Sequence, residues 1–248
     1  MGTAFFRFYE ELNDFLPGRK KKQQFLHSFN GNPSVKDAIE ALGVPHVEVD
    51  MILVNGESVD FSYRLKNNDH VSVYPVFESL DISKIQHLRA EPLRIVKFVA
   101  DVHLGRLIRY LRLLGFDTVY DSTFTDNEII RISVSQKKII LTRDKGLLKN
   151  RKITHGYWIR SVNPRKQLNE VIDKFDLRRL FKPFTRCLEC NGLIKDVPKE
   201  QISGKLLPKT GKYFDHFYTC PDCKRVYWEG SHYEKMKQFV ESLEKQEK

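Results

Sequence analysis

The sequence predicts a multidomain protein of α/β and α+β class, with three parts that differ in pattern. The first part has strand-like runs around a single helical segment. The middle part alternates apolar runs of strand length with amphipathic helices, and the last part carries two pairs of closely spaced cysteines. The chain has 248 residues, of which 41% are hydrophobic and 12% aromatic, so each part has enough apolar side chains for a folded core.

Residues 1–82 are expected to form the first domain. Strand-like runs lie at residues 5–10, 25–29, 49–54, 59–63 and 70–76. A helix is expected to begin after Ser34, a favourable N-cap, and to end at Gly43. Asn55-Gly56 is a typical hairpin turn between two strands. Two strands, a helix and then further strands is the element order of a β-grasp, or ubiquitin-like, domain.

Residues 93–181 are expected to form a second domain after a polar connection at residues 82–92. Its strands are expected at residues 93–101, 117–121, 138–144 and 157–160. Its helices are expected at residues 103–114, 126–136 and 164–175. Regular alternation of strands and helices predicts an open, mainly parallel α/β sheet.

Three acidic residues follow this alternation. Asp101 ends the first strand, Asp144 ends the third, and Asp126 opens the helix after the second. In parallel sheets, sites lie outside the carboxyl ends of the strands. Carboxylates that converge there repel one another unless cations or protons compensate them, and oxygen ligands favour Mg²⁺ or Mn²⁺. Such ions activate water for hydrolysis of phosphodiesters.

Helix capping is the alternative role for these acids. Thr125 and Glu128 fit a capping box around Asp126, and Asp101 and Asp144 precede possible helices. Further acids nearby are weaker candidates, namely Asp121 and Glu128, while Asp117 is expected to be a turn residue.

The charge distribution indicates a polyanionic partner. The net charge is +10, yet residues 1–82 hold 8 Lys and Arg against 12 Asp and Glu, whereas residues 83–181 hold 21 against 10. Nucleic acid is the favoured partner of such a basic segment. Three arginines recur at helical spacing behind Asp101 and could contact phosphates, the alternative being a solvated helix face. The candidate phosphate-binding residues are Arg106, Arg109 and Arg112, together with Arg143.

All four cysteines belong to two Cys-x-x-Cys motifs in residues 182–248. They are Cys187, Cys190, Cys220 and Cys223, and 29 residues separate the two motifs. Four thiolates at this spacing predict a structural Zn²⁺ site in a zinc ribbon, with redox-active pairs or disulfides as the alternative. A polar helix is expected from Tyr233 to the C-terminus.

Several motifs resemble a known family. They are Phe98-Val99-Ala100-Asp101-Val102-His103-Leu104-Gly105-Arg106-Leu107, Thr142-Arg143-Asp144, Arg186-Cys187-Leu188-Glu189-Cys190-Asn191-Gly192 and Tyr227-Trp228-Glu229-Gly230-Ser231-His232. Together they are similar, over residues 93–235, to the family named after the C-terminal ribonuclease domain of the Mut-seven exonuclease protein. The resemblance implies a PIN-like nuclease domain followed by a zinc ribbon, with its acidic site at Asp101, Asp126 and Asp144. His103 stands where methionine is more usual.

The first domain carries a resemblance of its own. It is similar to the ubiquitin-like domain often joined to this nuclease module in prokaryotic proteins. Residues 54–60 and 68–76 also resemble small sulfur-carrier proteins, which act through a free C-terminal Gly-Gly tail. Here the chain continues with Phe77-Glu78-Ser79-Leu80, so we expect a binding role for this domain and not carrier chemistry.

The sequence patterns, together with the resemblance to this ribonuclease family, imply a metal-dependent ribonuclease with catalytic Mg²⁺ or Mn²⁺ and structural Zn²⁺. The expected partners are RNA and a protein that binds the N-terminal domain. The alternative function is a non-catalytic RNA-binding or ribosome-associated adaptor. No apolar run long enough to span a membrane and no signal pattern occur in the sequence, and few cysteines are present, so a cytoplasmic location is expected.

Overall fold

The computed structural model describes residues 1–75 and 96–245. Contacts divide the chain into two compact units, of which one comprises Met1–Ile95 with Thr125–Ile159 and the other comprises Val96–Phe124 with Arg160–Lys248. The predicted polar connection at 82–92 lies outside the described residues, as do Val76, the start of the strand expected at 93–101 and the last three residues of the C-terminal helix.

The N-terminal part contains a five-stranded sheet of order β2-β1-β5-β3-β4. Its strands are β1 (Gly2–Phe8), β2 (Phe25–Phe29), β3 (Val49–Val54), β4 (Glu57–Val59) and β5 (Asp69–Pro75). Strand β1 pairs antiparallel with β2 and parallel with β5. This arrangement confirms the predicted β-grasp fold. The strand expected at 59–63 ends at Val59, because the Asp60 carboxylate accepts the Ser62 backbone N–H in a turn.

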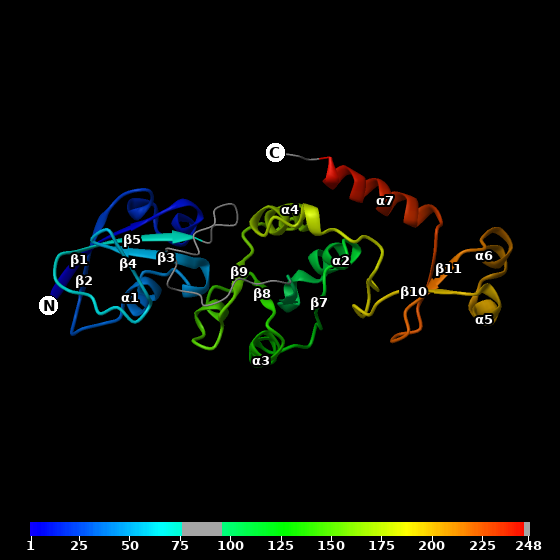
Figure 1. The fold of residues 1–248 in the computed structure, drawn as a ribbon, viewed down its shortest axis with the longest axis horizontal. Helices are drawn as coiled ribbons and strands as arrows, with labels where there is room; N and C mark the ends of the chain where they lie inside the picture. Colours follow the sequence, from blue (N-terminus) through cyan, green and yellow to red (C-terminus); the bar gives the residue numbers. More distant parts are fainter. Residues whose placement is uncertain (76–95, 246–248) are drawn as a thin grey trace. The chain divides into compact units, whose positions relative to one another are not determined.

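Helix α1 (Val35–Ala41) lies on one side of this sheet (Figure 1). It begins as predicted, since the Ser34 hydroxyl accepts the Asp37 N–H and the Asp37 carboxylate accepts the Ser34 N–H. Buried Val35 and Ile39 of α1 share one apolar core with Phe6 and Ile52 of the sheet. The alternation of apolar side chains along the strands therefore supplies the face that the helix covers.

The second sheet has four strands in the order β7-β6-β8-β9. They are β6 (Phe98–Ala100), β7 (Thr118–Val119), β8 (Ile139–Thr142) and β9 (Gly156–Trp158). Strand β6 pairs parallel with β7, and β8 pairs parallel with β9. The helices between them are α2 (Gly105–Leu113), α3 (Asp126–Gln136) and α4 (Pro164–Lys174). This parallel α/β arrangement confirms the class predicted for the middle of the chain.

Helix α2 ends at Gly115, as the sequence predicts. The φ angle of Gly115 is +92°, and a Cβ there would lie 2.2 Å from the Lys182 carbonyl oxygen. A residue with a side chain is therefore excluded both by conformation and by space. The Lys182 N–H donates to the Leu114 carbonyl, which brings the start of the cysteine-bearing segment against the end of this helix.

The cysteine-bearing segment forms a three-stranded antiparallel sheet of order β10-β11-β12. Its strands are β10 (Lys195–Val197), β11 (Phe217–Thr219) and β12 (Val226–Trp228), and two short helices, α5 (Lys199–Ile202) and α6 (Pro208–Tyr213), follow β10. The C-terminal helix α7 (Ser231–Glu244) starts two residues before the predicted Tyr233. No helix in the described part of the chain is long and apolar enough to cross a membrane.

Candidate functional site

The four cysteine sulfurs form a compact cluster. All four Sγ atoms lie within 4.8 Å of one another. The Cys187 and Cys223 sulfurs are 3.5 Å apart, and those of Cys190 and Cys220 are 3.3 Å apart. All four cysteines are free thiols, so the disulfide alternative does not describe this structure. A closed set of four sulfur donors fits one tetrahedral Zn²⁺ ion and leaves no position for a substrate.

Each Cys-x-x-Cys motif folds as a tight turn that points its sulfurs at the cluster. The Asn191 N–H donates to the Cys187 carbonyl, and the Lys224 N–H donates to the Cys220 carbonyl. Asn191 and Lys224 have left-handed φ angles of 73° and 61°, which reverse the chain directly after each motif. At Gly192, a Cβ would lie 2.9 Å from the Cys220 sulfur, so the close approach of the two turns depends on this glycine.

Electrostatics in the cluster favour a bound cation. Burial raises the pKa of the Cys187 thiol, but hydrogen bonds from the Tyr227 hydroxyl and from backbone N–H groups outweigh it and lower the pKa to about 6. Burial, with added contributions from neighbouring cysteine sulfurs, raises the pKa of Cys190 to about 12. The Cys187 thiol thus ionises readily, whereas ionisation of Cys190 beside it is unfavourable. A bound divalent ion would compensate the negative charge of additional thiolates.

Arg112, a candidate phosphate-binding residue by its spacing in the sequence, directs its side chain into the protein interior. Its side chain is buried, with 3% of the residue exposed. The guanidinium donates to the carbonyl oxygens of Thr118, Leu188 and Glu189 at distances of 3.0, 3.1 and 2.6 Å. Arg112 therefore joins helix α2 to the first cysteine turn, and the prediction that it contacts a phosphate is wrong in this fold.

Asn191 makes a second connection from the cysteine cluster to the α/β sheet. Its Oδ1 accepts the Thr118 N–H at 2.9 Å, and its Nδ2 donates to the Asp117 carboxylate at 2.8 Å. Sequence reasoning missed this role, although the position of Asn191 directly after Cys190 was a signal for a left-handed turn residue. The cluster is consequently part of the same packed body as β7 and α2.

The three predicted catalytic acids lie at the ends of two strands and at the start of one helix. Asp101 directly follows β6, is buried, and makes no side-chain capping bond to the turn that follows. Asp126 is the exposed first residue of α3, whose capping box is made by Thr125 and Glu128. Asp144 is exposed after β8, and its Oδ1 accepts the Gly146 N–H at 2.7 Å.

The structure places these acids in two groups. Asp101 belongs to one compact unit and Asp126 and Asp144 belong to the other, so their convergence stays a prediction. Within the described residues, the four cysteines form the group of three or more potential ligand side chains that could hold a metal ion. The two weaker acidic candidates have other partners, since Glu128 completes the capping box and the Asp121 carboxylate accepts the Thr123 N–H and hydroxyl. Asp117, expected to be a turn residue, accepts a hydrogen bond from the Asn191 side chain.

Comparison with family models decides the relationship of this chain. The model described as Mut7-C RNAse domain matches residues 96–240, which is more than half of the 248 residues. The chain belongs to the Mut7-C RNase domain family. The model described as Mut7-C ubiquitin matches residues 1–81. Both matches, and their order, confirm the resemblance seen in the sequence.

Other comparisons add little to this Mut7-C assignment. No curated protein matches the chain. Among solved structures, the chain is similar to SAMP1 from Haloferax volcanii, with 18% identity and a TM-score of 0.26, covering 32% of this chain and 100% of that chain.

The remaining candidate arginines of the Mut7-C chain are exposed, and their surroundings differ. Arg106 lies on the exposed side of α2. Arg109, three residues later, forms an ion pair with Glu189 of the first cysteine turn. Arg143 is exposed between Thr142 and Asp144. Arg106 and Arg143 are thus the better candidates for phosphate contacts, because part of the Arg109 charge is already compensated.

In this Mut7-C chain the loop that carries Asp144 is held by aromatic residues. The Lys145 ammonium lies 3.8 Å from the centroid of the Trp158 ring and 5.0 Å from that of Phe15. The Phe15 and Trp158 ring centroids are themselves 5.0 Å apart, and the Trp158 indole N–H donates to the Arg143 carbonyl at 3.2 Å. Phe15 belongs to the β-grasp part, so that part contributes directly to the position of the loop beside Asp144.

Substitution of Phe15 by alanine should reduce the free energy of unfolding by about 3 kcal/mol, because the ring is nearly fully buried and its loss leaves a cavity. We also expect faster hydrogen exchange at residues 143–146, since Lys145 loses one of its two aromatic partners. Urea denaturation and hydrogen exchange measure these effects. Leu26→Ala, at a half-exposed position on β2, is the control, and an equal loss in both variants would contradict the role of Phe15.

Proposed function

We propose that the protein is a ribonuclease that hydrolyses RNA phosphodiester bonds with Mg²⁺ or Mn²⁺ held by Asp101, Asp126 and Asp144. The observation that carries the proposal is the match of the Mut7-C RNAse domain model over residues 96–240, a span that contains all three acids. The excess of basic residues in the middle of the chain supports a polyanionic substrate.

The chemistry of the acids fits a hard divalent cation. All three supply carboxylate oxygens, which Mg²⁺ and Mn²⁺ prefer. The bond from the Gly146 N–H to Oδ1 fixes the Asp144 carboxylate, and Oδ2 has no hydrogen-bond donor among the described residues. A bound ion would supply an activated water and neutralise charge at the phosphate. Arg106 and Arg143 would hold the RNA backbone beside the acids.

The four cysteines would hold a structural Zn²⁺ ion in this proposal. The ion would take no part in cleavage, because four sulfur donors leave no open position. The ion would hold the first cysteine turn in the conformation in which it accepts hydrogen bonds from Arg112 and in which Asn191 bonds to Thr118 and Asp117. The β-grasp part would fix the Asp144 loop through Phe15 and offer the rest of its surface to a protein partner.

Cleavage of labelled single-stranded RNA, with and without added Mn²⁺, tests the proposal directly. We expect cleavage that depends on the added metal. RNA binding in the absence of any cleavage would contradict the enzyme and favour a non-catalytic adaptor. Failure to bind RNA at all would contradict both functions.

The Arg106→Ala variant should bind RNA more weakly, and the slope of log affinity against log salt should fall by about 0.7 to 0.9, because one phosphate contact is lost. Arg109→Ala should have a smaller effect, since Arg109 is already paired with Glu189. Binding titrations at several salt concentrations measure the slope. Arg64→Ala in the β-grasp part is the control, and a slope equal to that of the control would place the RNA path elsewhere.

A further inference from the structure

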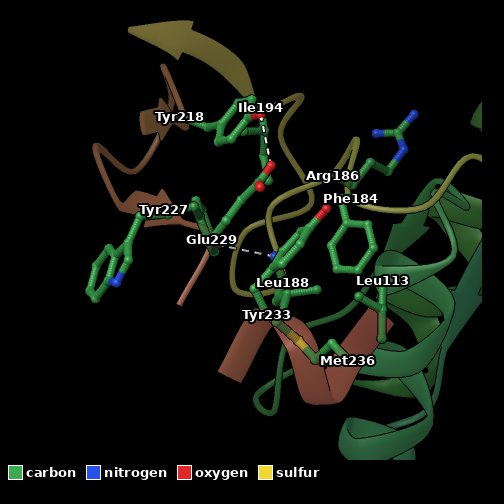
Figure 2. A pocket seen from close by; sticks show the side chains of 11 residues that line it. Leu113, Phe184, Arg186, Leu188, Ile194, Tyr218, Tyr227, Glu229, Tyr233 and Met236 are labelled. Atoms are coloured by element: carbon green, nitrogen blue, oxygen red, sulfur yellow. Dashed lines mark hydrogen bonds between the residues drawn. The ribbon is translucent and has the colours of Figure 1, made fainter. Parts of the chain in front are cut away.

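An aromatic cavity opens beside the cysteine cluster, where the end of α2, the first cysteine turn, strands β11 and β12 and the start of α7 meet. Its volume is about 140 Å³. Five aromatic side chains line the cavity, and Figure 2 shows the lining residues from close by. The five aromatic residues are Phe184, Tyr218, Tyr227, Trp228 and Tyr233. All of these residues belong to the same compact unit, so the cavity lies within a single packed body.

The lining residues contribute to the cavity in different ways. The Tyr227 hydroxyl contacts the Cys187 sulfur at 3.0 Å and accepts the Leu188 N–H at 3.3 Å, so Tyr227 fixes this wall to the cysteine cluster. The rings of Phe184 and Tyr233 lie with centroids 4.5 Å apart and form another wall. Glu229 adds a carboxylate, whose Oε1 accepts the Tyr218 O–H at 3.3 Å. The cavity therefore combines aromatic faces with the acceptor Glu229 and with Arg186, whose guanidinium donates to the carbonyl oxygens of Gly115 and Asn191.

The size and chemistry of the cavity fit a single planar ring system. Its volume is smaller than the roughly 300–1,000 Å³ of pockets that hold drug-sized ligands, so it suits one base and not a whole nucleotide. Aromatic side chains stack on unpaired bases, and proteins read the Watson–Crick edges of such bases by hydrogen bonds. A carboxylate accepts hydrogen bonds only, and guanine presents two neighbouring donors, N1–H and the N2 amino group, on that edge.

The cavity also lies on the path expected for RNA. Leu113, the last residue of α2, lines it, and Arg106 is near the start of the same helix. Seven residues of α-helix span about 10 Å. An RNA strand whose phosphate contacts Arg106 thus has a cavity for a base at the far end of the helix, within reach of the next nucleotides.

We propose that this cavity binds one unpaired nucleobase of a single-stranded RNA, with guanine preferred, stacked on Tyr233 and hydrogen-bonded to Glu229. This inference rests on the proposed function in that RNA is the ligand, but it does not require cleavage. It assigns to the cysteine-bearing segment a role in choosing the RNA sequence, in addition to its structural role.

The test compares the binding of ten-nucleotide oligouridine with that of the same strand carrying one central guanine, without added Mg²⁺ or Mn²⁺. We expect the wild type to bind the guanine strand about tenfold more tightly, because guanine, unlike uracil, offers two neighbouring donors to the Glu229 carboxylate. Tyr233→Ala should remove this difference. Glu229→Gln should reduce the preference for guanine and favour adenine, because the amide supplies one donor and one acceptor.

Tyr213→Ala is the matched control, since Tyr213 is 68% exposed and does not line the cavity. Calorimetry with guanosine alone provides a second measurement that needs no RNA strand, and we expect wild-type binding that Glu229→Gln abolishes. Equal affinity for both strands, with RNA binding intact and no guanosine binding, would overturn the cavity proposal alone. Loss of all binding to RNA in the wild type would instead overturn the proposed function.

Discussion

Asp144→Asn is expected to lower Mn²⁺-dependent RNA cleavage by about two orders of magnitude or more, because the catalytic ion loses a charged ligand and its water becomes less acidic. The fold should persist. Asparagine keeps an oxygen that can accept the Gly146 N–H, the bond that Oδ1 of Asp144 makes in the structure. The change in unfolding free energy should therefore be a few tenths of a kcal/mol, or slightly stabilising where repulsion among the acids is relieved.

The measurement pairs cleavage rate with thermal stability for the wild type and the variant. Asp121→Asn is the matched control, since the Asp121 carboxylate also accepts a backbone N–H two residues ahead, from Thr123, but lies outside the proposed metal site. We expect the control to cleave RNA at the wild-type rate. If Asp144→Asn also cleaves at that rate, Asp144 has a structural role only and the acidic site lies elsewhere.

The sequence predicted the structure best where a residue type at a given spacing has one common structural role. The Cys-x-x-Cys spacing predicted a cluster that the structure forms, and Thr125 with Glu128 predicted a capping box that the structure contains. The strand-like run at residues 49–54 predicted β3 with its observed ends at Val49 and Val54. Local rules are sufficient in these cases, because the partners lie close together in the sequence or must meet to bind one ion.

Interactions between distant segments were not predictable in the same way. Periodicity placed Arg112 on the same helix face as Arg106 and Arg109, but it could not show that the first cysteine turn covers this end of α2 and accepts three hydrogen bonds from the guanidinium. Likewise, nothing in the sequence near Lys145 indicates that Phe15, 130 positions earlier, lies against its ammonium group. Tertiary packing, which no single-sequence pattern encodes, decides the role of such long cationic side chains.

Cys187→Ser is expected to release zinc and to unfold the cysteine-bearing segment, since structural zinc sites contribute about 10–16 kcal/mol in zinc-finger peptides at neutral pH. The structure predicts that the damage extends beyond residues 182–248. Arg112 donates to the carbonyls of Leu188 and Glu189, and Asn191 bonds to both Thr118 and Asp117. When the first cysteine turn loosens, the buried guanidinium loses two partners and the edge strand β7 loses its side-chain contacts, so α2 and β7 should also be destabilised.

Elemental analysis of zinc, together with hydrogen exchange across residues 96–124, measures both effects. Glu189→Gln is the control, because residue 189 lies inside the same Cys-x-x-Cys turn but supplies no sulfur, and its exposed ion pair with Arg109 contributes little. The control should keep one zinc per chain and wild-type protection. Cys187→Ser with full zinc content would contradict the metal assignment. Zinc loss with unchanged protection of α2 would show that the cysteine segment and the α/β sheet are energetically independent, contrary to the contacts of Arg112 and Asn191.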